Sequence, residues 1–258
     1  MNVFSDFLNG ADFERHVQET ILQYQKALCA IDLKKFNSNI IDPIKLTFDR
    51  AVFQKSMQQL IEDEISRQRD KTATNVIGYF HQNIFRYFPN CVVPREGWDV
   101  IVTQKDGTKI YVEMKNKHNT MNSSAAGKTF IKMQNQLLKD DDCACFLVEA
   151  IAKKSQNIKW ETSVDGQRMG HRLIRRVSLD QFYALVTGQE DAFYQMCMTL
   201  PEVIQRVVEA GGNELVPHDT VMEELIAIAN ENNLENRDLA IAMAIYMLGF
   251  STYSGFTK

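Results

Sequence analysis

The spacing of apolar positions divides the chain into a helical start, a middle with strand character and a helical end. Residues 12–30 repeat apolar side chains every three or four positions, which predicts an amphipathic helix. A second helix is expected over residues 48–69, with Glu64 on or beside its apolar stripe. A third helix is expected to begin at a cap formed by Asp70 or Thr72 and to end at Pro89.

After Pro89, apolar residues recur at every second position, which is the period of a β-strand. Strands are expected over 91–93, 98–103 and 109–116, followed by a helix over 125–139, a buried strand over 143–151 and a hairpin over 157–177. Further helices are expected over 179–187, 190–210, 218–232 and 235–249. This order predicts an α/β fold with a mixed sheet flanked by helices.

The stretch GWDVIVTQKDGTKIYVEMKNK, residues 97–117, reads as two strands around a tight turn. Successive side chains of a strand point to opposite faces. Glu113 and Lys115 therefore share one face with Tyr111, while the apolar residues between them share the other. An acid and a base are thus held together on a rigid, core-backed element, which suits a reacting site.

The position of Asp99 depends on the turn. A two-residue loop, Asp106-Gly107, would set Asp99 opposite Met114 and away from Glu113. A three-residue loop that begins at Lys105 would set Asp99 directly opposite Glu113, and Gly107 suits the left-handed position that ends such a loop. The sequence permits both registers.

Two neighbouring carboxylates repel each other and are normally tolerated with a cation between them. All-oxygen ligation with room for water suits Mg²⁺. A lysine beside such a site can position or deprotonate a water. Asp99, Glu113 and Lys115 together therefore suit metal-assisted phosphodiester hydrolysis.

Composition and charge are those of an ordinary globular protein, with 45% hydrophobic residues, 24% charged residues and a net charge of −4. Residues 187–258 contain 11 acids and 3 bases, so residues 1–186 carry a net positive charge. Two stretches, 114–139 and 166–179, contain lysine or arginine and no acid, so a polyanion can be attracted locally. Scattered cysteines without zinc-site spacing, no secretory signal and no membrane-length apolar run predict a cytoplasmic protein without a membrane partner.

The helix, hairpin, helix and strand around the Asp99 and Glu113-Met114-Lys115 motif resemble the core of the PD-(D/E)XK nuclease superfamily, although Trp98 stands where that superfamily often has proline. The segments GWDVIV, YVEMKNKHNTMNSSAAGKTFIKMQNQL and RRVSLDQFYALVTGQEDAFYQM resemble, more closely, the type II restriction endonucleases that cleave GGNCC. The likeness extends from about residue 40 to 205. It implies three segments: N-terminal helices over 1–47, a nuclease core with an added hairpin over 48–186, and a helical region over 187–258 packed on the same domain.

The resemblance implies a Mg²⁺-dependent homodimer that cuts both strands of double-stranded DNA at a short palindrome and leaves 5′-phosphate and 3′-hydroxyl ends. Asp99 and Glu113 would hold the metal, with the Met114 carbonyl as a third ligand, and Lys115 would activate or position the attacking water. Glu64 is a candidate outer carboxylate. The middle base pair could be any pair or limited to A·T, and a cytosine methyltransferase is expected as a genetic rather than a physical partner.

DNA contacts are expected from the polar segment after the active strand, from the lysines of the following helix and from the arginine-rich hairpin. Asparagine and serine can donate and accept hydrogen bonds, and arginine commonly reads guanine. The candidates are Lys117, His118, Asn119, Asn122, Ser123, Ser124, Lys128, Lys132, Arg168, Arg172, Arg175 and Arg176, with Arg67 and Arg69 as a second choice for base reading.

Two other functions fit the same residues. A repair or junction-resolving nuclease would use the same core but would read DNA shape instead of a palindrome. A catalytically silent DNA-binding protein would cut nothing, and the intact Asp99, Glu113 and Lys115 set argues against it.

Overall fold

The structure is a computed structural model that describes residues 7–27, 29–39, 41–118, 121–211, 218–230 and 237–251. The chain forms two compact units, each built from separated segments. The first unit comprises residues 1–22 and 75–212, and the second comprises 23–74 and 213–258. Among the described residues, no helix combines the length and the apolar character needed to cross a membrane.

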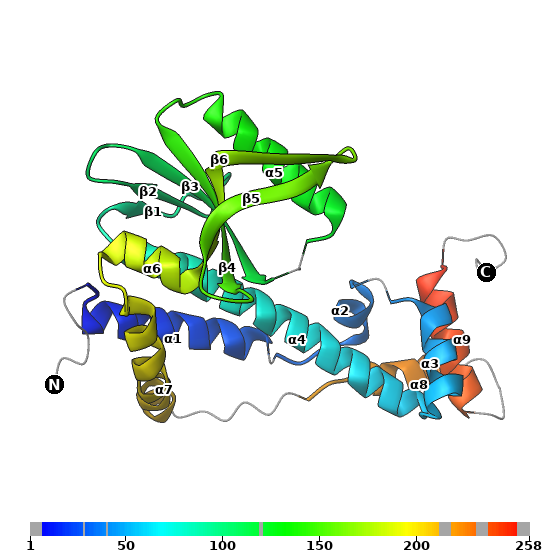
Figure 1. Cartoon of the computed structure of the whole chain (residues 1–258). Helices are drawn as coiled ribbons and strands as arrows, with labels where there is room; N and C mark the ends of the chain where they lie inside the picture. Colours follow the sequence, from blue (N-terminus) through cyan, green and yellow to red (C-terminus); the bar gives the residue numbers. More distant parts are fainter. Residues whose placement is uncertain are drawn as a thin grey trace. The chain divides into compact units, whose positions relative to one another are not determined.

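The first unit contains a six-stranded mixed sheet in the order β1-β2-β3-β4-β6-β5 (Figure 1). Its strands are β1 (Cys91–Val92), β2 (Val100–Thr103), β3 (Lys109–Lys117), β4 (Cys143–Ile151), β5 (Asn157–Val164) and β6 (Gln167–Ser178). β3, β4 and β6 run parallel, and the outer pairings are antiparallel. The predicted α/β class with a mixed sheet is confirmed.

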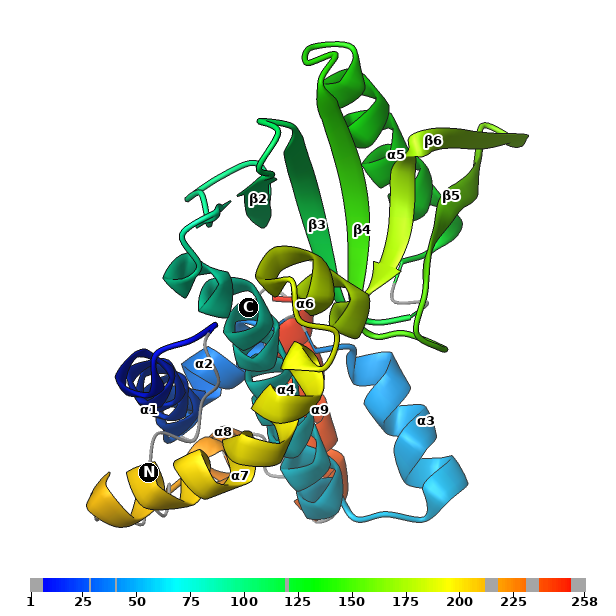
Figure 2. The same cartoon turned by 60° about the vertical axis from the view of Figure 1, so that its left-hand side comes forward.

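Helices cover both faces of this sheet (Figure 2). On one face, α5 (Ser123–Leu137) buries Phe130 and Met133 against Leu147 and Trp160. The other face packs against α6 (Leu179–Thr187), α1 (Gly10–Ala27), α7 (Ala192–Gly211) and the end of α4 (Met57–Asn83), which continues as the short 3₁₀ helix η1 (Ile84–Tyr87). β4 lies in the centre and is buried along most of its length, as its apolar sequence predicts.

The second unit is a helical cluster of α2 (Leu33–Asn37), α3 (Pro43–Phe53), the first part of α4, α8 (Val221–Asn230) and α9 (Arg237–Gly249). Its core joins Phe36, Leu46 and Ile61 to Leu225 and Ile241. The expected segment boundaries at residues 47/48 and 186/187 therefore do not match the compact units. Residues 48–74, α8 and α9 belong to the second unit, and α7 belongs to the first.

The helix boundaries before the sheet also differ from the prediction. The helix is interrupted at Gln54, whose left-handed conformation at φ 52° caps the end of α3, and α4 begins at Met57. No break occurs at Asp70 or Thr72. Thr72 Oγ1 instead donates to the Gln68 carbonyl at 3.0 Å, one turn earlier in the same helix. A hydroxyl that can cap a helix can also be accommodated inside one in this way.

The hairpin of β2 and β3 adopts the three-residue loop. Val100 pairs with Val112 and Thr103 with Lys109, while the Gln104 N–H donates to the Thr108 carbonyl at 2.9 Å. Gly107 closes the loop at φ 89°, a conformation that glycine adopts without strain. The same register, extended by one position, sets Asp99 opposite Glu113.

Candidate active site

The residues expected to carry the chemistry converge on one hollow of about 350 Å³ in the first unit. β3 contributes Glu113, Met114 and Lys115, and Asp99 lies just before β2. The remaining lining residues come mainly from the end of α4: Asn75, Gly78, Tyr79, His81 and Gln82, with Asn116 and Ala150. The hairpin and the helix end therefore build the site together.

Asp99 is fixed by backbone contacts. Its Oδ2 accepts a hydrogen bond from the Met114 N–H at 2.6 Å, and its carbonyl accepts one from Gln82 Nε2 at 3.2 Å. Oδ1 has no hydrogen-bond partner within the described part of the chain. Burial, together with the nearby charge of Glu113, raises the pKa of Asp99 despite the Met114 hydrogen bond.

Glu113 is held by two lysines. Lys115 Nζ lies 2.9 Å from Oε1 and Lys132 Nζ lies 2.7 Å from Oε2. Burial would raise the pKa of Glu113, but the hydrogen bonds from Lys132 and Lys115 outweigh burial and lower it. The paired carboxylates therefore have pKa values shifted in opposite directions, a pattern typical of functional sites.

Lys132 was expected to contact DNA from the outer face of its helix, and the structure brings it to Glu113. Its Nζ also donates to the Gly97 carbonyl at 2.5 Å and lies 4.2 Å from the centre of the Trp98 ring. In the sequence, Lys132 stood out as one of a row of lysines on the predicted helix that became α5. Only the packing of α5 against the sheet shows that one lysine of this row turns inward.

The donor set allows a divalent cation, because Asp99, Glu113 and Met114 line the same hollow. Among the described residues, no group of three or more acidic, histidine or cysteine side chains gathers as a ready metal site. A metal would thus rest on two carboxylates, the Met114 carbonyl and water. Mg²⁺ usually retains several waters, so such a set suits it.

Glu64 lies on the part of α4 that belongs to the second unit and does not line this hollow. Its carboxylate accepts hydrogen bonds from Arg67 at 2.6 Å and from Gln68 at 3.1 Å. Arg69, the other arginine of the second choice for base reading, pairs with Asp219 at 2.6 Å. The structure therefore gives Glu64 and both arginines local partners and does not bring them to the catalytic residues.

The residues expected to contact DNA are spread over several positions. Lys117 is exposed at the end of β3, Ser123 and Ser124 are exposed in the first turn of α5, and Lys128 is exposed further along that helix. Asn122 is the N-cap of α5 and accepts from the Ala125 N–H at 2.8 Å, so its side chain has a structural role. Asn119 lies outside the described residues.

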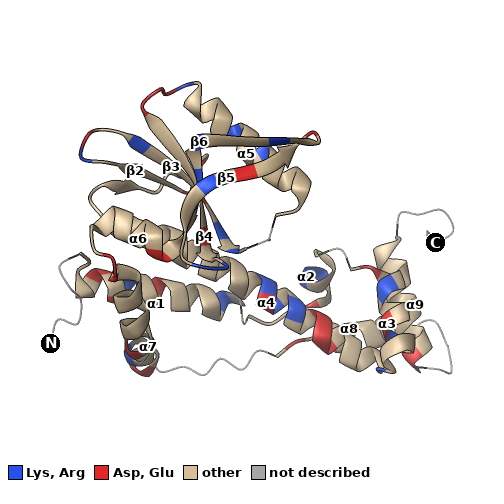
Figure 3. Cartoon of the chain, in the orientation of Figure 1, with Lys and Arg blue, Asp and Glu red and all other residues tan. Residues whose placement is uncertain are grey.

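Basic positions lie along the β5–β6 hairpin (Figure 3), and its arginines differ in the partners that they contact. Arg168 pairs with Glu161 at 2.6 Å, and Arg175 donates to the side chain and carbonyl of Asn157. Arg176 reaches a buried glutamate on β4. Arg172 is exposed on β6 and, of the four, is the one without a side-chain ion pair or hydrogen bond to another described residue.

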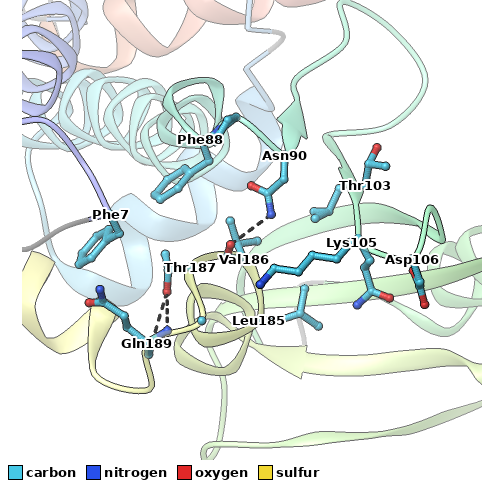
Figure 4. A pocket seen from close by; sticks show the side chains of 14 residues that line it. Phe7, Phe88, Asn90, Thr103, Lys105, Asp106, Leu185, Val186, Thr187 and Gln189 are labelled. Carbon is cyan, nitrogen blue, oxygen red and sulfur yellow. Dashed lines mark hydrogen bonds between the residues drawn. The ribbon is translucent and has the colours of Figure 1, made fainter.

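A second hollow in the first unit, of about 930 Å³, has different chemistry. Its lining includes Phe88, Asn90, Lys105 and Leu185, and Figure 4 shows the Asn90 side chain hydrogen-bonded to Val186 across it. Asp106 is the single carboxylate among its lining residues. This hollow has no carboxylate pair and therefore lacks the arrangement that supports phosphodiester cleavage.

A mixed sheet whose hairpin sets a carboxylate pair beside a lysine defines a nuclease. Comparison with known proteins then gives the family. A family model described as the Eco47II restriction endonuclease matches residues 5–209. The type II restriction enzyme Sau96I of Staphylococcus aureus is 33% identical over 240 residues, which cover 90% of this chain and 92% of that enzyme.

The type II restriction enzyme Eco47II of Escherichia coli is 26% identical over 220 residues, which cover 79% of this chain and 87% of that enzyme. The chain belongs to the Eco47II restriction endonuclease family. It is a type II restriction endonuclease, that is, a site-specific deoxyribonuclease. This assignment replaces the alternatives of a junction-resolving nuclease and a silent DNA-binding protein.

Proposed function

We propose that this enzyme is a Mg²⁺-dependent homodimer that cleaves both strands of double-stranded DNA at a short G·C-rich palindrome, GGNCC or a subset of it. The observation that carries the catalytic part is the hairpin register, which sets Asp99 opposite Glu113 with Lys115 on the same face of β3. The palindrome is supported by the similarity to the GGNCC-cleaving enzymes. A cytoplasmic location and a genetically linked cytosine methyltransferase remain predictions.

In the proposed reaction a water oxygen attacks the phosphorus, the bond from phosphorus to the 3′ oxygen breaks, and the products carry a 5′-phosphate and a 3′-hydroxyl. Asp99, Glu113 and the Met114 carbonyl would hold Mg²⁺, which supplies Lewis-acid stabilisation of negative charge on the phosphate. Asp99 is oriented for this by the Met114 N–H and by Gln82. Lys115 positions or activates the water, and Lys132 keeps Glu113 directed to the site after Lys115 turns to the water.

Digestion of plasmid DNA with Mg²⁺ or with EDTA, followed by sequencing of the ends, tests this function. We expect fragments whose ends fall at one palindrome, no cutting in EDTA, and ends that DNA ligase rejoins without prior phosphorylation. Ends at random positions, or activity undiminished by EDTA, would contradict the proposal.

Arg172→Ala is expected to lower cognate cleavage roughly 5- to 140-fold while nonspecific DNA binding changes little. The reason is that Arg172 is exposed on β6, and a lost arginine–guanine contact reduces discrimination by about 1–3 kcal/mol. Binding to a cognate and to a scrambled duplex, measured with the cleavage rate, checks this. An equal loss of affinity for both duplexes would reject a base-reading role.

A further inference from the structure

Beside the catalytic residues lies a buried ionic cluster that the reaction above does not use. Glu149 on β4 has a side chain only 2% exposed. Its Oε1 accepts a hydrogen bond from Arg176 Nη2 on β6, and its Oε2 lies 3.1 Å from His118 Nδ1. Burial would raise the pKa of Glu149, but the hydrogen bond from Arg176 outweighs burial and lowers it. A buried charge is expensive to keep, so its presence calls for a function.

The cluster lies on the same face of the sheet as the catalytic residues. Glu149 pairs in register with Lys115 on the neighbouring parallel strand, so both side chains project from the same face. Arg176 pairs with Leu147, which itself pairs with Glu113. Adjacent strands are about 4.8 Å apart, so the cluster is one to two strand spacings from the cleavage site.

The contacts of Arg176 exclude the usual way of reading guanine. Its Nη2 donates to Glu149 and also lies 2.7 Å from His118 Nδ1, which uses both N–H groups of that nitrogen. Its Nε is buried without a partner among the described residues. A bidentate contact to guanine needs two adjacent N–H donors. Nη1, with its two N–H groups, remains for an outside ligand.

His118 is oriented by the same contacts. Its Nδ1 lies 2.7 Å from Arg176 Nη2 and 3.1 Å from Glu149 Oε2, so this nitrogen is engaged within the cluster, and Nε2 is the ring nitrogen without a partner among the described residues. The His118 N–H also donates to the Ile151 carbonyl at 2.8 Å, which continues the pairing of β3 with β4 and fixes the backbone. The side chains of His118 and Arg176 are 17% and 21% exposed, so each reaches the surface only at its tip.

We propose that Glu149 is a positioning residue that holds Arg176 and His118 as a preformed pair of donors for one phosphate of the DNA backbone, next to the phosphate that is cut. This inference rests on the proposed function. Such N–H donors suit phosphate oxygens, which accept hydrogen bonds and carry no base information. The pair thus sets the register of the DNA strand on the sheet, so that the scissile phosphate reaches Asp99, Glu113 and Lys115.

The test separates a DNA contact from simple neutralisation of a buried carboxylate. Arg176→Gln alone leaves Glu149 without its partner and can unfold the protein, so the informative variant is the double substitution Glu149→Gln with Arg176→Gln, which removes both charges and keeps amide hydrogen bonds. The control is Glu202→Gln with Arg206→Gln, which removes the same two charges from an exposed pair, joined at 2.9 Å, on α7 of the same unit.

We expect the Glu149/Arg176 double variant to fold but to bind duplex DNA in EDTA with a salt slope smaller by about 1, since one phosphate contact is lost. Its cleavage rate at saturating DNA should fall roughly 10- to 100-fold, because a misplaced substrate reacts slowly. Glu149→Gln alone should also slow cleavage while its nonspecific binding is as tight as that of the parent or tighter. The control pair should match the parent in all three measurements.

Recovery of parental cleavage and salt slope in the double variant would show that Arg176 only neutralises Glu149, and would reject the inference. A parent enzyme that cuts at no palindrome would instead contradict the proposed function. The two failures are distinguishable because the salt slope is measured without Mg²⁺ and without cleavage.

Discussion

Lys115→Ala is expected to abolish most cleavage while leaving the protein folded and able to bind DNA. The substitution removes the group that positions or activates water, and loss of such a group typically costs about 10²- to 10⁴-fold in rate. Folding should persist because Lys132 still contacts Glu113 Oε2 at 2.7 Å, so the half-buried carboxylate keeps one cationic partner. Single-turnover cleavage of a cognate duplex, with binding measured in EDTA, checks both parts.

Lys109→Ala is the matched control for this experiment. Lys109 is exposed and projects from the same face of the same strand as Lys115. It lies six residues earlier, which at about 3.3 Å per residue is roughly 20 Å from the site. The Lys109→Ala enzyme should cleave at the parental rate. A Lys115→Ala enzyme that cleaves within tenfold of the parent would remove lysine from the mechanism and leave the carboxylates and the metal to perform it.

The face of the strand on which each hairpin side chain lies was predictable, because it depends only on whether two residues are an odd or an even number of positions apart. Strand geometry put Glu113 and Lys115 on one face, and the structure confirms this. The loop was the open question, since Asp106-Gly107 is itself a good two-residue turn. The structure shows the loop that begins at Lys105, in which the Asp106 side chain accepts from the Thr108 N–H at 2.9 Å. This hydrogen bond joins residues only two positions apart. The pattern of apolar and polar residues does not show whether the three-residue loop that contains it is more stable than the two-residue turn.

Contacts between elements were not predictable in the same way. An amphipathic stripe shows that a helix has a partner but does not say which one. The stripes of α7 and α8 look alike in sequence, yet Met196 packs in the core of the first unit and Leu225 in that of the second. Lys132 and Glu149 were missed as members of the site region for the same reason, because their roles arise from side chains brought together across strands and helices.

Asp99→Asn is expected to abolish cleavage without lowering stability. The asparagine oxygen can still accept the Met114 N–H, so the hairpin keeps its contact, and the negative charge needed for a cation is lost. Because the folded state raises the pKa of Asp99 above its ordinary value of 3.8, ionisation of this group opposes folding. Its stabilising contribution is fully present below pH 3.8 and is lost as the pH rises through the folded pKa.

The asparagine variant should therefore melt at or above the parental temperature at neutral pH, by on the order of one or two degrees, and the difference should vanish toward acidic pH. Added Mg²⁺ should raise the melting temperature of the parent, since a ligand of the folded state stabilises it, and should leave the variant unchanged. Scanning calorimetry between pH 4 and pH 8, with and without Mg²⁺, measures both effects.

Asp106→Asn is the control, because hydrogen bonds from Thr108 lower the pKa of this exposed loop carboxyl and give its pH effect the opposite sign. If Mg²⁺ stabilises the Asp99→Asn protein as much as the parent, the metal is held elsewhere and the assignment of Asp99 as its ligand is wrong.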